Sequence, residues 1–216
     1  MIRAVLFDFG GVVLSSPFEA FAGYERDNGL PEGLIRHINS TNPDDNAWAH
    51  LERSDVTLDG FAAMFEAEAG LLGHEVSGRV ILGLLSGDPR PRMVEAVRRC
   101  SEQMITACLT NNFMTKSGEG SGIASRTPER EDEVAKIMTL FDEVIESSRI
   151  GIRKPELGFY ERALEILEIE ANEAVFLDDL GINLKPAKAM GMTTIKVVDP
   201  DEAIRELEQV VGFALG

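Results

Sequence analysis

The sequence is poor in cysteine and histidine, and neither residue type is arranged to bind a metal or form a disulfide. The two cysteines, Cys100 and Cys108, lie among apolar neighbours, and the three histidines are scattered. A CxxC pair or a Cys/His cluster would indicate zinc or a redox site, so the sequence excludes both kinds of site. Free thiols are typical of a reducing compartment, and we therefore expect a cytoplasmic protein.

Long hydrophobic runs and positive charge are also scarce. The apolar run at residues 2–7 ends at Asp8, which makes it too short for a signal peptide or a membrane span. Only 21 Lys and Arg face 37 Asp and Glu, so the formal net charge is −16. Because this charge repels nucleic-acid phosphates and anionic membranes, we expect neither as a partner. A small anion remains compatible, since a bound divalent cation reverses the local potential.

What the sequence does contain is an alternation of strand and helix patterns. Short runs of branched apolar residues, typical of strands buried on both faces of a parallel sheet, occur at residues 2–7, 104–109, 173–177 and 193–198. Helical patterns occur at residues 89–99, 155–167 and 182–190. The alternation predicts an α/β fold with a Rossmann-like, doubly wound parallel sheet.

Between residues 16 and 88 the strand pattern disappears. Phe61 and Phe65 belong to apolar positions repeated at three- and four-residue spacing, which predicts a helical cap inserted after the first strand. These two residues and Trp48 either pack inside the cap or line a substrate pocket. The α/β core is accordingly expected at residues 1–15 and 89–216.

The stretch at residues 115–134 is polar and rich in glycine and serine. Such a composition buries too little apolar area to become ordered. We expect a mobile loop between the second core strand and the helix that follows it.

Polar residues follow the first two predicted strands. Asp8, with Gly10 and Gly11, comes directly after the first, and Thr110-Asn111 comes directly after the second. Ligands of open α/β folds bind at the carboxyl edge of the sheet. A hydroxyl, an amide and backbone N–H groups at that edge suit phosphate oxygens, and glycines let the backbone approach a ligand.

Two further polar features lie in the second half of the chain. Lys154 precedes Pro155, where the pattern predicts a helix start, so its ammonium and the helix dipole would act on the same anion. Asp178 and Asp179 follow a predicted strand, with Asn183 nearby. Adjacent carboxylates repel each other, and Mg²⁺ relieves that repulsion.

Each feature alone has a plainer interpretation. Asp8 could be a turn former, and Thr110 and Asp178 could cap the segments that follow them. Lys154 could be a solvated surface charge, with Arg153 as the residue that binds an anion. All four features in order at strand ends favour a functional site.

In that order, the motifs resemble those of the haloacid dehalogenase superfamily: a strand-end Asp, a strand-end Thr or Ser, a Lys, and a paired acidic motif. The stretch at residues 176–187, FLDDLGINLKPA, and Thr110-Asn111-Asn112 are most similar to the N-terminal phosphatase domain of soluble epoxide hydrolases. The resemblance covers nearly the whole chain, cap included.

The resemblance implies a Mg²⁺-dependent hydrolase that acts on a small phosphate monoester through an aspartyl-phosphate on Asp8. Thr110 would bind the phosphoryl oxygens, and Lys154 would neutralise them and restrain Asp8. The implied substrate-binding residues are Thr110, Asn111, Lys154 and Gly11. The implied metal site consists of Asp8, the backbone carbonyl of Gly10, Asp179 and, further from the metal, Asp178.

Gly10 departs from the pattern, because most phosphatases of this type carry a second aspartate there as the general acid and base. General acid catalysis is typically worth about a hundred- to ten-thousandfold in rate. The substrate could have a good leaving group, a cap residue or water could carry the proton, or the protein could bind phosphate with little turnover.

A metal-free haloacid dehalogenase is a further alternative, against which the Asp178-Asp179 pair argues. The substrate's identity and the oligomeric state stay open.

Overall fold

The computed structural model describes residues 1–85, 87–112 and 128–216. Within them, five strands form one parallel sheet in the order β3-β2-β1-β4-β5, which confirms the predicted fold class. The strands are β1 (Ala4–Phe7), β2 (Ile105–Thr110), β3 (Glu143–Glu146), β4 (Ala174–Asp178) and β5 (Thr193–Lys196).

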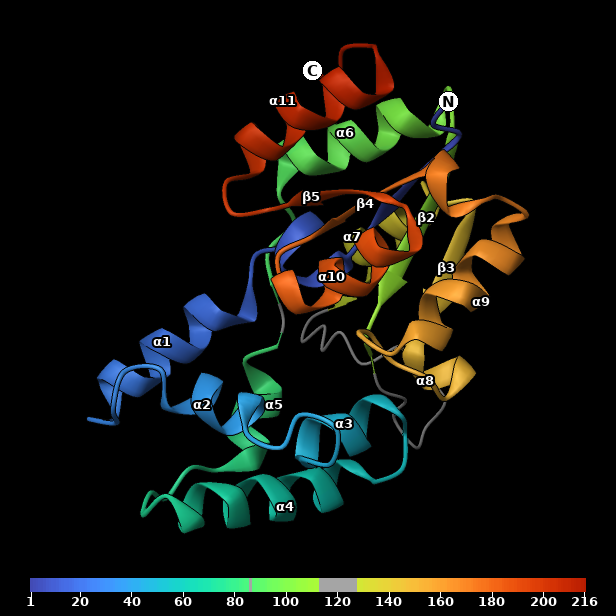
Figure 1. Cartoon of the computed structure of the whole chain (residues 1–216). Coiled ribbons are helices and arrows are strands. Elements are labelled where there is room, and N and C mark those ends of the chain that lie inside the picture. Colours follow the sequence, from blue (N-terminus) through green and yellow to red (C-terminus); the bar gives the residue numbers. More distant parts are fainter. Residues whose placement is uncertain (86, 113–127) are drawn as a thin grey trace.

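Helices cover both faces of the sheet (Figure 1). One face carries α6 (Pro91–Ser101), α7 (Pro128–Met138) and α11 (Pro200–Val211), and the other carries α9 (Leu157–Leu167) and α10 (Gly181–Met190). Shorter turns are η1 (Phe9–Val13), α8 (Ser147–Ile150) and η2 (Ala171–Glu173). In the part of the chain that the structure describes, no helix is long and apolar enough to cross a bilayer.

The central strand β1 shows why a parallel sheet has a continuous apolar sequence. Successive side chains point to opposite faces, so Val5 and Phe7 pack beneath α6 and α11, while Ala4 and Leu6 pack beneath α9 and α10. All four side chains are fully buried. The strand therefore stops where the first charged residue appears.

The predicted strands and core helices lie within two residues of the observed ones, but α11 was not among the predicted helices and β3 was missed. This strand is at the edge of the sheet and reads Glu-Val-Ile-Glu, with Glu143 exposed and only Ile145 buried among its apolar residues. An edge strand needs no continuous apolar run, so the pattern that identified the inner strands was absent.

The prediction of a loop over residues 115–134 is wrong from residue 128 onward, where α7 begins. Glu129 and Glu131 lie in its first turn, where carboxylates favour a helix. Val134 and Ile137, three residues apart, pack against the core and anchor it. Residues 113–127, which hold the rest of the predicted loop, lie outside the described residues.

Between η1 and α6 the chain forms a helical insertion, defined here as residues 17–83. It lies beyond the carboxyl ends of the strands (Figure 1). The chain leaves and re-joins the core at neighbouring points, because Leu14 pairs antiparallel with Pro89. The insertion consists of α1 (Pro17–Asp27), α2 (Leu34–Ser40), α3 (Ala47–Glu52), α4 (Leu58–Leu71) and α5 (Gly78–Gly83).

The insertion has a hydrophobic core of its own. Phe61 and Phe65 stack with ring centroids 5.6 Å apart, and Trp48 packs edge-on against Phe61. Phe61 and Phe65 are fully buried, so they belong to the interior rather than to a pocket. Trp48 packs in this core and also lines the cavity described below.

Candidate functional site

The site lies where the strand order reverses. The chain goes from β1 outward through β2 and β3, and then returns to the other side of β1 for β4 and β5. At such a switch point the loops after neighbouring strands diverge and leave a crevice at the carboxyl edge. Asp8 follows β1 there, and its N–H donates to the Leu177 carbonyl of β4 at 2.8 Å.

Asp8 is held through one of its two carboxylate oxygens. Its Oδ1 lies 2.8 Å from the Lys154 ammonium and accepts the Phe9 N–H at 2.7 Å. No hydrogen bond from the described residues reaches Oδ2. The residue is 8% exposed and lines a cavity, so the carboxylate is fixed in place with one oxygen left to react or to bind a cation.

Lys154 is 1% exposed and bridges two carboxylates, those of Asp8 and Asp178, at 2.8 and 2.9 Å. The helix α9 begins at Leu157, two residues after the predicted start near Pro155, so Lys154 precedes the helix by three residues. The buried ion pairs, rather than a helix N-terminus, therefore position this lysine.

Arg153, the alternative anion partner, has its charge compensated elsewhere. Its Nε lies 2.5 Å from Oε2 of Glu52, which belongs to the insertion. The structure therefore places Lys154, and not Arg153, beside Asp8.

Asp178 is fully buried and saturated with hydrogen bonds. It accepts from Lys154 Nζ at 2.9 Å, from the Leu180 N–H at 2.8 Å and from the Asn183 amide at 3.0 and 3.1 Å. It is not the N-cap of α10, which is Leu180. Asp178 thus anchors Lys154, while Asp179 beside it lines the cavity.

The three carboxylates crowd together. Asp8, Asp178 and Asp179 each place an oxygen within 4.8 Å of the others. Burial raises the pKa of Asp8 to about 8, and repulsion from Asp178 and Asp179 acts in the same direction. The positive charge of Lys154 lowers this pKa but does not offset the increase. Burial and Asp178 raise the pKa of Asp179 to about 6. Burial alone would lower the pKa of Lys154, but the carboxylates of Asp178 and Asp8 raise it above its ordinary value.

These observations fit a divalent cation. One ammonium leaves a negative excess among three carboxylates, and oxygen donors are what Mg²⁺ prefers. Gly11 adds a geometric argument, because its φ is +85° and a Cβ there would collide with the Asp179 carboxylate. The space that Asp179 occupies therefore exists only because position 11 is glycine. Gly10, by contrast, has φ −73° and open space around its Cβ direction.

Thr110 and Asn111 adjoin the same cluster from β2. Thr110 is the last residue of the strand, is 3% exposed and lines the cavity. The Asn111 side chain holds the backbone of Lys154, accepting from its N–H and donating to its carbonyl, both at 2.9 Å. It also donates to Glu52 at 3.1 Å. Its amide is thus occupied by protein groups, a role that the sequence did not indicate.

A cavity of about 520 Å³ lies over these residues, between the sheet edge and the insertion. Both parts supply charged lining: Asp8, Lys154 and Asp179 come from the sheet edge, and Arg36, Asp44 and Glu52 come from the insertion. The insertion and its connections supply apolar lining, including Phe18, Phe21, Trp48 and Leu85. Gly10 lines the cavity, whereas Gly11 is buried beside Asp179.

Residues 2–191 match the sequence family of haloacid dehalogenase-like hydrolases. The chain belongs to this family of hydrolases. The resemblance that the ordered motifs indicated is therefore confirmed.

Relatives of this hydrolase include parts of much longer proteins. It is 34% identical over 223 residues to mouse acyl-CoA dehydrogenase family member 10, covering 99% of this chain and 19% of that protein. It is 30% identical over 226 residues to pig bifunctional epoxide hydrolase 2, covering 99% and 40%. A sesquiterpene phosphatase of Aspergillus oryzae is 28% identical and is covered over 97% of both chains. The chain thus spans less than half the length of the first two relatives.

Solved structures with the same fold include a magnesium and phosphate complex and a dehalogenase. A haloacid dehalogenase family enzyme from Bacteroides thetaiotaomicron, in complex with magnesium and inorganic phosphate, matches with a TM-score of 0.59 at 20% identity, over 91% of this chain and 94% of that one. An L-2-haloacid dehalogenase from Xanthobacter autotrophicus matches with a TM-score of 0.61 at 18% identity, over 100% and 85%. At these identities the matches show the shared fold alone.

Proposed function

We propose that this hydrolase is a Mg²⁺-dependent phosphatase of small phosphate monoesters, with Asp8 as the nucleophile. The observation that carries the proposal is the convergence of Asp8, Asp179 and Lys154 at one cavity, with more negative charge than the lysine balances. A metal-free dehalogenase would have no use for that excess charge.

In this proposal the cation is held by Asp8, Asp179 and the backbone carbonyl of Gly10. When bound, Mg²⁺ stabilises the negative charge on the phosphoryl oxygens in the transition state. Both oxygens of Asp178 accept hydrogen bonds from Lys154, Leu180 and Asn183, so Asp178 positions Lys154 rather than binding the cation directly.

The reaction proceeds in two displacements at phosphorus. Asp8 attacks the phosphoryl group, the bond to the alcohol oxygen breaks, and an aspartyl-phosphate forms. Water then attacks the same phosphorus, which releases inorganic phosphate and regenerates the carboxylate. Lys154 and the Phe9 N–H hold the carboxylate through Oδ1, and the Thr110 hydroxyl and the Asn111 backbone N–H bind the transferring oxygens.

Gly10 leaves the departing alcohol without an aspartate to protonate it. We propose that esters with good leaving groups react fastest, with water in the cavity as the proton source for the others. The helical insertion acts as a cap, and the aromatic rings of Phe18, Phe21 and Trp48 in its lining favour an alcohol with an apolar body over a sugar. The full-length similarity to a sesquiterpene phosphatase supports that preference.

The test is phosphate release from a panel of esters, including p-nitrophenyl phosphate, prenyl phosphates and sugar phosphates, with Mg²⁺ or with chelator. We expect release only with Mg²⁺, and a loss of at least about a thousandfold in Asp8→Asn. Release that ignores chelator would contradict the proposal.

A second candidate is hydrolytic dehalogenation of a short haloacid without metal. Gly10 favours it, because the proton donor of most phosphatases is missing, and dehalogenases are among the structural neighbours. Halide release from a 2-haloacid, unaffected by chelator and lost in Asp8→Asn, would establish this activity. Mg²⁺ and phosphate binding without release of either product would indicate a binding protein with little turnover.

A further inference from the structure

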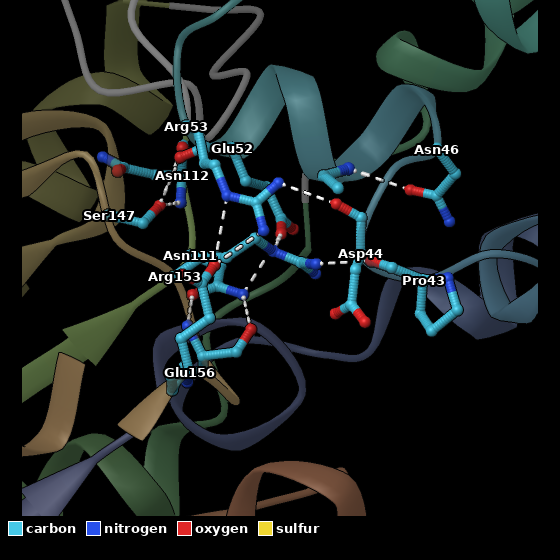
Figure 2. Close-up of polar contacts among 12 residues, drawn as sticks. Pro43, Asp44, Asn46, Glu52, Arg53, Asn111, Asn112, Ser147, Arg153 and Glu156 are labelled. Carbon is cyan, nitrogen blue, oxygen red and sulfur yellow. Dashed lines mark hydrogen bonds and ion pairs between the residues drawn. The ribbon is translucent and has the colours of Figure 1, made fainter. Parts of the chain in front are cut away.

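Two neighbouring residues at the end of α3 connect the insertion to the core at different places (Figure 2). Glu52 reaches Arg153 and Asn111, whereas Arg53 reaches Glu156 through two hydrogen bonds of 3.1 and 2.8 Å. Only the first connection leads to residues adjacent in sequence to the proposed catalytic groups.

The Glu52 connection is compact and shielded from solvent. Its Oε2 accepts from Arg153 Nε at 2.5 Å and from Asn111 Nδ2 at 3.1 Å. The Glu52 and Arg153 side chains are 17% and 14% exposed. Because screening by water is reduced there, this ion pair fixes geometry more firmly than an exposed one.

From Glu52 the contacts continue to the reacting groups. Asn111 binds both the N–H and the carbonyl of Lys154, and Lys154 binds Asp8. Asn111 also directly follows Thr110. Glu52 therefore lies one hydrogen bond away from the residue that orients the lysine and neighbours the phosphate-binding threonine.

A second link starts from the Glu52 backbone. Its carbonyl accepts from Ser147 Oγ at 2.8 Å, and Ser147 Oγ accepts the Asn112 N–H at 3.0 Å. Ser147 is fully buried. The end of α3 thus contacts two consecutive residues after β2. The Glu52 side chain binds Asn111 directly, and the Glu52 carbonyl is linked to Asn112 through the Ser147 hydroxyl.

Local helix preference does not explain a glutamate at this position. Glu52 is the last residue of α3, where the helix dipole disfavours a carboxylate. Its partners Arg153 and Asn111 are distant in sequence and belong to the core. The residue is therefore accounted for by its contacts across the boundary rather than by its own helix.

We propose that Glu52 is a positioning residue: by seating the insertion on Arg153 and Asn111, it holds Lys154 and the loop after β2 in the arrangement that transfers the phosphoryl group. Correct seating of the insertion and assembly of the reactive site are then coupled. This inference rests on the proposed phosphatase function.

The test compares Glu52→Gln with Glu156→Gln, two near-isosteric changes that each break one ion pair between the same two parts of the molecule. With p-nitrophenyl phosphate, Glu52→Gln should lower kcat by about ten- to a hundredfold with little change in KM. Glu156→Gln should leave both parameters near wild type. Thermal unfolding of each variant establishes that the fold is retained, and Glu52→Asp, with a shorter side chain and the same charge, replaces Glu52→Gln if that variant does not fold.

Equal losses in the two variants, or no loss in Glu52→Gln, would overturn the inference. Adding Arg153→Gln to Glu52→Gln should lower kcat little further, because one contact is already broken; independent, additive losses would also count against it. If the wild type hydrolyses no ester, the proposed function fails, and the role of Glu52 is then measured by calorimetry with inorganic phosphate and Mg²⁺. Weaker binding in Glu52→Gln alone supports the inference, and unchanged binding overturns it.

Discussion

The sheet edge and the helical insertion contribute to the same cavity with different chemistry. The sheet edge brings buried, mutually constrained charges, with Lys154 between Asp8 and Asp178. The insertion brings apolar rings such as Phe18 and Trp48. In our account the first region determines the reaction and the second selects the alcohol. Substitutions among the charged groups of the sheet edge and among the apolar rings of the insertion should therefore change different kinetic parameters, whereas Glu52, which joins the two regions, acts on the sheet edge.

The largest effect short of removing the nucleophile is expected at the sheet edge, in Gly11→Ala. The new Cβ would be strained at φ +85° and would displace the Asp179 carboxylate. Activity and Mg²⁺ affinity should fall by about a hundredfold. Gly10→Ala is the matched control, because the space there is open. Similar losses in both variants, measured by calorimetry and kinetics, would refute the assigned role of Gly11.

Gly10→Asp should act in the opposite direction. The backbone at position 10 suits any residue, and a Cβ there meets no atom within 4 Å, so a side chain can start at this position without a clash. The aspartate would supply the missing proton donor and raise kcat for alkyl phosphates by about tenfold, with less effect on p-nitrophenyl phosphate. An equal change for both ester types would show that protonation of the leaving group does not limit the rate.

Phe18→Ala tests the insertion's side of the comparison. Phe18 is half-buried and lines the cavity, so its removal takes apolar contact from the alcohol and not from the phosphoryl group. KM for a prenyl phosphate should rise about tenfold while kcat stays close to wild type. A fall in kcat with unchanged KM would mean that Phe18 takes part in the chemistry rather than in selecting the alcohol.

The smallest effect concerns stability. Asp8 and Asp179 have pKa values of about 8 and about 6 in the metal-free fold, above their unfolded values. The native state therefore binds more protons than the unfolded chain, and stability falls as pH rises from about 4 to about 8. In chelator, Asp8→Asn should be more stable than wild type at pH 8 and similar at pH 4 by chemical denaturation. Mg²⁺ should reduce this difference in stability between the variant and the wild type at pH 8. A difference that does not change with pH would contradict the repulsion among the carboxylates.

The two regions also differ in how much of them the sequence predicted. Asp8, Thr110 and Asp179 were predicted to lie together because parallel strands end at one edge, and the structure places all three at one cavity. The edge strand β3 lacks the continuous apolar run of the inner strands and was missed, and residues 128–134 of α7 were assigned to the preceding loop.

Contacts across the boundary were beyond prediction for a different reason. Glu52 and Asn111 are 59 residues apart in the chain, and no periodicity relates a helix end in the insertion to a strand end in the core. The contact of Lys154 with Asp8 was expected from the family resemblance, but its second ion pair, with the buried Asp178, was not. Such contacts depend on how two separately packed units fit together.

The central claim is that Asp8 accepts a phosphoryl group while Mg²⁺ is bound. Rapid acid quenching during turnover of p-nitrophenyl phosphate, followed by mass spectrometry of the peptide containing Asp8, tests it directly. We predict one added phosphoryl group on Asp8 in the presence of Mg²⁺ and none with chelator or in Asp8→Asn. Turnover that leaves Asp8 unmodified, or modification that persists without a metal, would contradict the account.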